Sequence, residues 1–259
     1  MILTDTHTHL YLNQFDDDRE ATVQRAIDKG VRYMLLPNID SASADPLLAL
    51  CDKFPGHLFP MMGLHPTDVK ENYTAELEKV EQLLSRHKFY AIGETGIDLY
   101  WDKTFIEEQK YSLRHQIALA KQHQLPVVLH VRESFDEIFE VIEDTIDENL
   151  TGVFHCFTGT AEQARRIIGW GFRLGIGGVL TFKNSGLDMV VKDIPMEHLL
   201  LETDSPFLAP KPFRGKRNES AYITYIAGKL ATVKNMPVEE VADITTRNAV
   251  KLFGIPHTH

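Results

Sequence analysis

Short apolar runs alternate with longer amphipathic segments along the whole chain. Most of the runs span four to seven residues and are rich in Val, Ile, Leu and Phe, which is typical of parallel β-strands buried on both faces. They cover residues 2–6, 31–36, 58–63, 89–94, 127–130, 152–157, 172–177 and 199–202. The pattern therefore predicts eight strands separated by helices.

The intervening segments carry apolar residues at the three-and-four spacing of an amphipathic helix, as in 77–84 and 113–120. Two further helices are expected at about 221–234 and 238–253. In a chain of 259 residues this alternation predicts an α/β fold, a (β/α)8 TIM barrel with an extra C-terminal helix. A doubly wound parallel sheet would give the same alternation and remains the alternative.

Composition adds little to this picture. The chain is 43% hydrophobic and 25% charged, which excludes a disordered, collagen-like or disulfide-stapled protein. No apolar stretch approaches the roughly 20 residues of a membrane helix, and the N-terminus lacks the features of a secretory signal. With only two cysteines, we expect a cytoplasmic protein. No linker or repeat is apparent, so residues 1–254 are expected to form one domain, followed by a short tail at 255–259.

Ionisable side chains stand at the ends of five apolar runs. In a barrel these ends converge on one face, where active sites are built. A charge at the end of a buried strand is costly unless it is paired or bound to a metal ion. The sequence therefore predicts a metal site. Its ligands, in chain order, are His7, His9, Glu94, His130, His155 and Asp204.

This ligand set suits two metal ions better than one. A catalytic zinc ion usually has three protein ligands, whereas a two-metal site can share a bridging carboxylate and a water. Glu94 is the expected bridge and a catalytic group, and Asp204 is expected to orient or deprotonate the water. The donors suit zinc, manganese, iron or cobalt and allow magnesium. Cys156, by contrast, is expected to face the helices as a core residue.

The formal net charge of −10 argues against a protein that coats duplex DNA. Basic residues nevertheless cluster just after the predicted ligand at the eighth strand, and barrels often bind phosphate after strands seven and eight. We expect this loop to contact substrate through Arg214, Lys216 and Arg217. Lys183, which follows a glycine-rich segment, and His65, which follows the third strand, are further candidates for substrate binding.

Several motifs occur in a fixed order along the chain. They are His7-x-His9, Gly93-Glu94-x-Gly96-Ile97-Asp98, His130-x-Arg132, His155-Cys156-Phe157 and Thr203-Asp204-Ser205-Pro206, followed by Arg214-Gly215-Lys216-Arg217-Asn218. Together they resemble the TatD family of metal-dependent hydrolases across residues 1–254. The resemblance implies a TIM barrel of the amidohydrolase superfamily with metal-dependent deoxyribonuclease activity, including 3′→5′ exonuclease action on single-stranded DNA. It places the family's metal ligands on the same six residues.

The chain departs from the family pattern at two places. The family usually has an acidic residue soon after the His-x-His-Leu motif, where this chain has Tyr11. Two aromatic residues often follow the Gly-Ile-Asp motif directly, whereas here Leu99 precedes Tyr100 and Trp101. Both places lie on the loop face that would meet substrate. The differences therefore bear on substrate preference rather than on hydrolysis.

The sequence predicts a divalent-metal-dependent hydrolase, a deoxyribonuclease that cleaves phosphodiester bonds of single strands or strand ends with a metal-activated water. An alternative is hydrolysis of an ester, aminoacyl ester or amide on the same barrel. Many such barrels carry a carboxylated lysine at the fourth strand, where this chain has Glu94, so that subclass is disfavoured. A barrel that only binds nucleic acid is disfavoured because all six candidate ligands are present.

Overall fold

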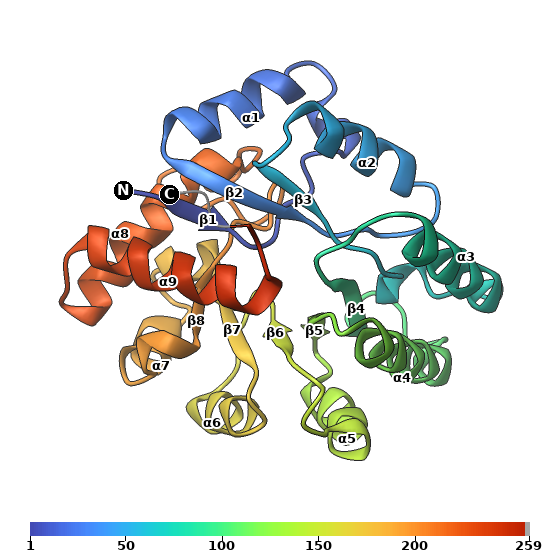
Figure 1. Cartoon of the computed structure of the whole chain (residues 1–259). Coiled ribbons are helices and arrows are strands. Elements are labelled where there is room, and N and C mark those ends of the chain that lie inside the picture. The colour runs from blue at the N-terminus through green and yellow to red at the C-terminus, as the bar shows by residue number, and fades with distance from the viewer. Residues whose placement is uncertain (257–259) are drawn as a thin grey trace.

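The computed structural model describes residues 1–256, and in this part of the chain eight strands alternate with helices (Figure 1). The strands are β1 (Leu3–Asp5), β2 (Val31–Leu36), β3 (Leu58–Pro60), β4 (Ile92–Asp98), β5 (Val127–Arg132), β6 (Gly152–Phe154), β7 (Arg173–Ile176) and β8 (Leu199–Leu201). The α-helices are α1 (Arg19–Asp28), α2 (Ala44–Lys53), α3 (Tyr73–Arg86), α4 (Ile106–His123), α5 (Phe135–Thr145), α6 (Ala161–Gly169), α7 (Leu187–Lys192), α8 (Ile223–Lys234) and α9 (Val238–Phe253). The predicted alternation and the two C-terminal helices are confirmed.

The strands pair in parallel in the orders β1-β2-β3 and β4-β5-β6-β7-β8. Backbone hydrogen bonds join the two sheets at both edges. Between β3 and β4, the Met62 amide donates to the Ala91 carbonyl at 3.1 Å, and between β8 and β1 the His9 amide donates to the Ser205 carbonyl at 2.7 Å. Because both edges meet, the strands form the predicted TIM barrel and not an open doubly wound sheet.

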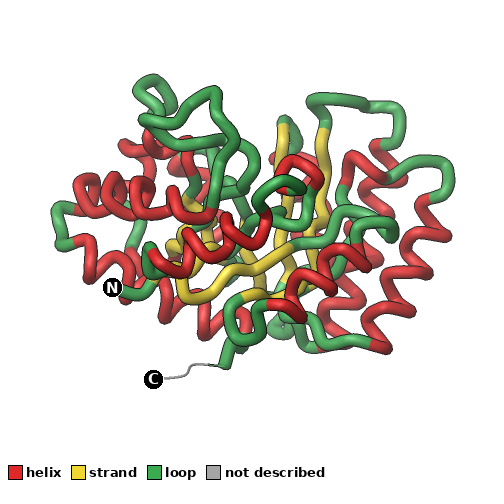
Figure 2. The backbone as a smooth tube through the Cα atoms, turned by 90° about the horizontal axis from the view of Figure 1, so that it is seen from above, coloured by secondary structure: helices red, strands yellow, loops and turns green. Residues whose placement is uncertain are grey.

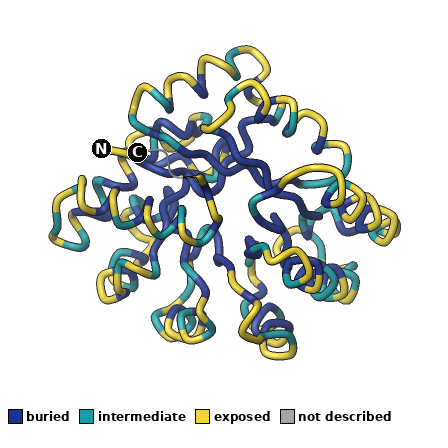
Figure 3. Tube along the Cα trace, in the orientation of Figure 1, coloured by how far each residue is buried: buried dark blue, intermediate teal, exposed yellow. Residues whose placement is uncertain are grey.

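The strands are buried at the centre and the helices expose their outer faces (Figure 3). Inside the barrel lies a separate apolar cluster that includes Tyr33, Phe59 and Phe253, the last of which belongs to α9. Two side chains of α9 reach the N-terminal ends of strands. Thr246 donates to the Ile2 carbonyl at 3.2 Å, and Asn248 donates to the Leu199 carbonyl at 2.9 Å. Helix α9 therefore closes the N-terminal end of the barrel, and the opposite end is left for a functional site.

Strand β4 differs from the expectation. Its apolar run was expected to end at Glu94, which instead is the third residue of Ile92–Asp98. The strand continues because Gly96 allows a close approach to β5, where a Cβ would lie 2.0 Å from the His130 carbonyl oxygen. Inward-facing polar side chains interrupt the apolar pattern here, so hydrophobicity alone ends the strand too early.

The chain end and the loops complete the fold. Ile255, expected in the tail, is only 3% exposed and belongs to the interior cluster, while residues 257–259 of that tail lie outside the described residues. Among the described residues, no helix combines the length and apolar character needed to cross a membrane. The longest loops gather at one end of the barrel, as Figure 2 shows.

Candidate metal centre

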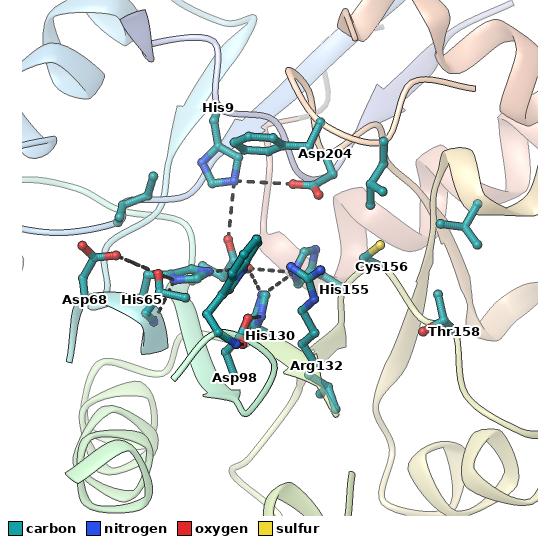
Figure 4. A pocket seen from close by; sticks show the side chains of 18 residues that line it. His9, His65, Asp68, Asp98, His130, Arg132, His155, Cys156, Thr158 and Asp204 are labelled. Atoms are coloured by element: carbon teal, nitrogen blue, oxygen red, sulfur yellow. Dashed lines mark hydrogen bonds and ion pairs between the residues drawn. The ribbon is translucent and has the colours of Figure 1, made fainter. Parts of the chain in front are cut away.

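All six predicted ligands converge at the C-terminal end of the barrel. Glu94 and His130 belong to β4 and β5, while the other four follow the ends of β1, β6 and β8. Their side chains border a cavity of about 680 Å³, with His7 buried beneath it. Figure 4 shows His9 and Asp204 on one side of this cavity and His130 on the other. Parallel strands in register deliver these side chains to one face, as the strand-end argument predicted.

The carboxylate of Glu94 lies at the centre of the group and is only 2% exposed. Its Oε2 lies 2.9 Å from Nε2 of His7 and 3.5 Å from Nε2 of His9. Its Oε1 lies 2.7 Å from Nδ1 of His130 and 2.7 Å from Nε2 of His155. The two oxygens thus face different imidazoles, an arrangement that suits a carboxylate bridging two cations.

Ring nitrogens of the histidines lie within hydrogen-bond distance of one another. Nε2 of His7 lies 3.2 Å from Nε2 of His9, and Nε2 of His155 lies 3.4 Å from Nδ1 of His130. Asp204 Oδ1 stands 3.6 Å from Nε2 of His9. Converging lone pairs of this kind are the donor set that a divalent transition metal prefers. The groups able to hold an ion are His7/His9/Glu94, His7/His155/Asp204 and His65/Glu94/His130.

Partners behind the rings fix which nitrogen faces the centre. Nε2 of His130 lies 2.9 Å from Oδ2 of Asp98, so this nitrogen carries the proton and Nδ1 presents its lone pair. Nδ1 of His9 lies 3.2 Å from the hydroxyl of Tyr11, which itself donates to the Pro37 carbonyl at 2.7 Å. The hydroxyl therefore accepts the Nδ1 proton of His9 and leaves Nε2 free to bind a cation.

A third buried partner stands behind His155. Nδ1 of His155 lies 3.5 Å from Oε1 of Glu202, and Glu202 is fully buried. Oε2 of Glu202 has no hydrogen-bond partner within the described part of the chain. A Cβ at residue 175 would lie 2.1 Å from this oxygen, so Gly175 makes room for the carboxylate. At 3.5 Å the two groups form an ion pair without a hydrogen bond at Nδ1. Burial lowers the pKa of the His155 ring, but the nearby carboxylates of Glu94 and Glu202 outweigh this and raise it.

His65 differs from these rings although it also faces Glu94. Its Nε2 lies 3.4 Å from Oε1 of Glu94, but its Nδ1 accepts the backbone N–H of Thr67 at 3.1 Å. The Thr67 hydroxyl lies 2.7 Å from the same Nδ1 and donates its own proton to Oδ2 of Asp68 at 2.9 Å, so both tautomers of His65 find a partner here. His65 lines the cavity, where it can contact substrate or act with Glu94 and His130 in holding an ion.

The ionisation of the cluster follows from its close charges. Burial raises the pKa of the Glu94 carboxyl, but the imidazoles of His155 and His7 outweigh this and hold it well below its usual range. Burial lowers the pKa of His9, yet the carboxylates of Asp204 and Glu94 raise it to about 9. In the absence of metal, protons balance these carboxylates. Bound cations would take the place of those protons.

The predicted basic contacts lie outside this cavity. Lys183, Arg214 and Lys216 are exposed and do not line the cavity, and the Arg214 guanidinium lies 4.0 Å from the ring centre of Phe182. Across residues 1–256 none of the three forms an ion pair, so their charges are free to meet a longer substrate. Arg217 is engaged elsewhere.

The guanidinium of Arg217 binds the carboxylate of Asp18 at 2.7 Å and that of Glu219 at 3.2 Å. It also lies over the Phe15 ring, 4.6 Å from the ring centre. These contacts tie the loop after β8 to the loop before α1. The geometry therefore gives Arg217 a role in holding this loop.

Sequence reasoning missed two buried carboxylates and misplaced one side chain. Asp98 lies at even spacing from Glu94 on β4, which marks the same strand face, whereas Glu202 follows the end of β8, where alternation gives no such signal. Cys156 lines the cavity, so the expectation that it faces the helices is wrong (Figure 4). Strand β6 ends at Phe154 and Cys156 has a φ of 46°, so the alternation of the strand no longer applies.

Imidazoles and carboxylates converge at the C-terminal ends of the strands of a parallel barrel. This arrangement is typical of the class of metal-dependent hydrolases. Comparison with known proteins agrees. A model of the family described as TatD related DNase matches residues 4–254. The chain belongs to this family of metal-dependent hydrolases and nucleases, which act on phosphodiester bonds.

Individual relatives span the whole chain. An uncharacterized metal-dependent hydrolase, YabD, of Bacillus subtilis is 40% identical over 255 residues, which cover 98% of this chain and 100% of the relative. The 3′-5′ ssDNA/RNA exonuclease TatD of Pantoea vagans is 32% identical, with 97% and 99% covered. The crystal structure of YjjV, a TatD homologue of Escherichia coli, superposes with a TM-score of 0.92 at 32% identity and covers 98% of each chain.

Proposed function

We propose that this protein binds two divalent cations and uses them to hydrolyse phosphodiester bonds at the ends of single-stranded nucleic acid. The observation that carries the proposal is the position of Glu94, whose two oxygens face different imidazoles. One cation would be held by His7, His9 and Asp204, and the other by His130 and His155, with Glu94 shared. Nitrogen and oxygen donors suit zinc, manganese, iron or cobalt, and the carboxylates allow magnesium.

The size of the cavity supports a strand end as the substrate. A volume of about 680 Å³ lies within the usual range for small-molecule sites, so it suits a terminal nucleotide better than a duplex. The net charge of −10 is compatible with binding of a strand end in the cavity and argues against binding along a duplex. The relative from Pantoea vagans, named as an exonuclease of single-stranded DNA and RNA, supports the same substrate class.

Each residue has a distinct role in this reaction. The bound cations supply Lewis acidity and lower the pKa of water from about 15.7 toward 7. Asp204 borders the cavity with a side chain 14% exposed, where it orients the attacking water and accepts its proton. His65 lines the cavity, where its imidazole contacts the substrate. Arg132, which also lines the cavity, stabilises the negative charge that grows on the phosphoryl group.

The proposal is tested with protein of defined metal content. Single-stranded DNA, RNA, duplex DNA and an aminoacyl ester are each incubated with the protein, with and without chelator. We expect chelator-sensitive release of 5′ mononucleotides from single strands. Asp204→Asn is expected to lower the rate about 10²- to 10⁴-fold because it removes the proton acceptor and keeps the shape of the side chain.

Asp188→Asn is the matched control, since Asp188 lies on α7 and pairs with Lys229 at 3.5 Å away from the cavity. It should retain the rate of the unchanged protein. Cleavage of the aminoacyl ester without release of nucleotides would favour the alternative hydrolase. An undiminished rate in metal-loaded Asp204→Asn protein would contradict the role of Asp204.

A further inference from the structure

The loop after β4 presents two large aromatic side chains to solvent beside the cavity. The Trp101 side chain is 69% exposed and lines the cavity, and Tyr100 beside it is 50% exposed. Their ring centres lie 4.8 Å apart at an interplanar angle of 88°. A tryptophan exposed to this degree at the mouth of a site leaves a broad apolar surface uncovered.

This loop is tied to the candidate metal centre by one carboxylate. Oδ1 of Asp98 accepts the backbone N–H of Tyr100 at 3.0 Å and that of Trp101 at 3.3 Å. Oδ2 of Asp98 lies 2.9 Å from Nε2 of His130. The same side chain therefore orients a candidate metal ligand and fixes the start of the aromatic loop. The position of Trp101 relative to the metal centre is set by these bonds.

A cation without a carboxylate partner completes this edge of the cavity. The Arg132 guanidinium lies 3.9 Å from the ring centre of Tyr100 and 5.2 Å from that of Trp101. Throughout residues 1–256, no carboxylate forms an ion pair with Arg132. Aromatic rings orient a guanidinium without neutralising it, so its charge remains available to a phosphate.

We propose that Trp101 and Arg132 form a nucleobase subsite, in which a base stacks on the indole while the neighbouring phosphate meets the guanidinium. The subsite deepens the proposed function and rests on it. Every base has a π-face, so stacking on an aromatic ring accepts any sequence and requires an unpaired base. On the β8 side of the cavity, Phe207 is 46% exposed and adds apolar surface for the rest of the strand. Exposed aromatic side chains combined with a free cation select single strands over duplex.

The experiment compares two substrates that carry the same phosphates. One is a thymidine oligonucleotide and the other an oligomer of the same length built from abasic sites. In metal-loaded protein, Trp101→Ala is expected to raise KM about tenfold for the thymidine oligomer, and to leave the abasic oligomer unchanged. Trp101→Phe should retain most of the preference for the thymidine oligomer over the abasic oligomer, because it keeps an aromatic face. Tyr111→Ala is the matched control, since Tyr111 is 53% exposed on α4 and does not line the cavity.

A binding measurement separates the subsite from the reaction. The chain has two tryptophans, so a Trp170→Phe protein reports on Trp101 alone. In chelator, the thymidine oligomer should quench this fluorescence and the abasic oligomer should not. Quenching without any hydrolysis in metal-loaded protein would support the subsite and overturn the proposed function. Hydrolysis with no difference between Trp101→Ala and the control would overturn the subsite alone. A change of oligomeric state on Trp101→Ala would also overturn it, since the ring would then contact another copy.

Discussion

Tyr11 does not line the cavity, but its hydroxyl contacts His9 and fixes which ring nitrogen of His9 can bind a cation. Its hydroxyl has one proton, which it donates to the Pro37 carbonyl at 2.7 Å. It must therefore accept the proton of His9 Nδ1, 3.2 Å away, and Nε2 of His9 is the nitrogen that faces Glu94, where it binds a proton or a cation. A phenol in this position orients the ring as a carboxylate would, but it adds no negative charge.

Replacing Tyr11 with phenylalanine should weaken binding of divalent cations about 10- to 100-fold, because His9 loses the partner that fixes its tautomer. Calorimetric titration of metal-free protein with Mn²⁺ measures this affinity. Tyr225→Phe serves as the control, since Tyr225 is 44% exposed on α8 and contacts Phe213. Equal affinity in Tyr11→Phe and the control would show that His9 is oriented by other contacts.

The candidate ligands could be selected from the sequence by a single physical rule, and the structure brings the six side chains together. A buried strand rarely ends on a charged side chain, so His130 and His155 stood out against apolar neighbours. The partners behind the rings, such as Asp98 and Tyr11, did not stand out. Even spacing from Glu94 marks the strand face of Asp98, but which ring each partner meets across the barrel cannot be read from spacing along the chain. Cys156 was misplaced because strand alternation fails where the backbone leaves the strand.

At the scale of elements, helix α9 and the candidate metal centre lie at opposite ends of the barrel. Phe253, only 3% exposed, fills the N-terminal end of the interior together with Ala249. Strand positions followed from apolar runs with errors mainly at the C-terminal ends, as at β4. These ends carry the polar site residues, so the signal for a strand is weakest where the function is located. The segment of α9 was predicted at its observed bounds because it has no such residues to accommodate.

Truncation of Phe253 to alanine should lower the free energy of unfolding by about 3–5 kcal/mol, because it leaves a cavity in the barrel interior. Metal affinity and turnover in the folded protein should not change, since the metal centre lies at the opposite end. Urea denaturation measures the first effect and calorimetric titration the second. Met189→Ala, at a position 69% exposed on α7, should change stability by less than about 0.5 kcal/mol. A loss of metal affinity in Phe253→Ala would reveal coupling between the two ends.

At the scale of the whole molecule, the net charge of −10 hides a local balance at the site. Buried carboxylates there need positive charge, which either protons on the imidazoles or divalent cations can supply. The contacts of His9 with Asp204 and Glu94 outweigh burial and raise its pKa from 6.5 to about 9. In metal-free protein this proton contributes stability that is fully present below pH 6.5 and is lost as the pH rises through about 9.

Metal loading should therefore raise the Tm more at high pH than at low pH. Mn²⁺ at 100-fold above its Kd contributes about 2.7 kcal/mol, which corresponds to about 5–10 °C for a chain of this size. We expect this increase to be larger at about pH 8.5 than at about pH 6.5, because fewer protons compete with the cation for His9. In addition, the metal-free protein has by then lost part of the stability that the proton on His9 contributes. Differential scanning fluorimetry with and without chelator measures the shift, and NaCl at matched ionic strength controls for screening. An increase in Tm that shrinks as the pH rises would mean that protons on the imidazoles do not compete with the cation, and that the metal binds away from this cluster.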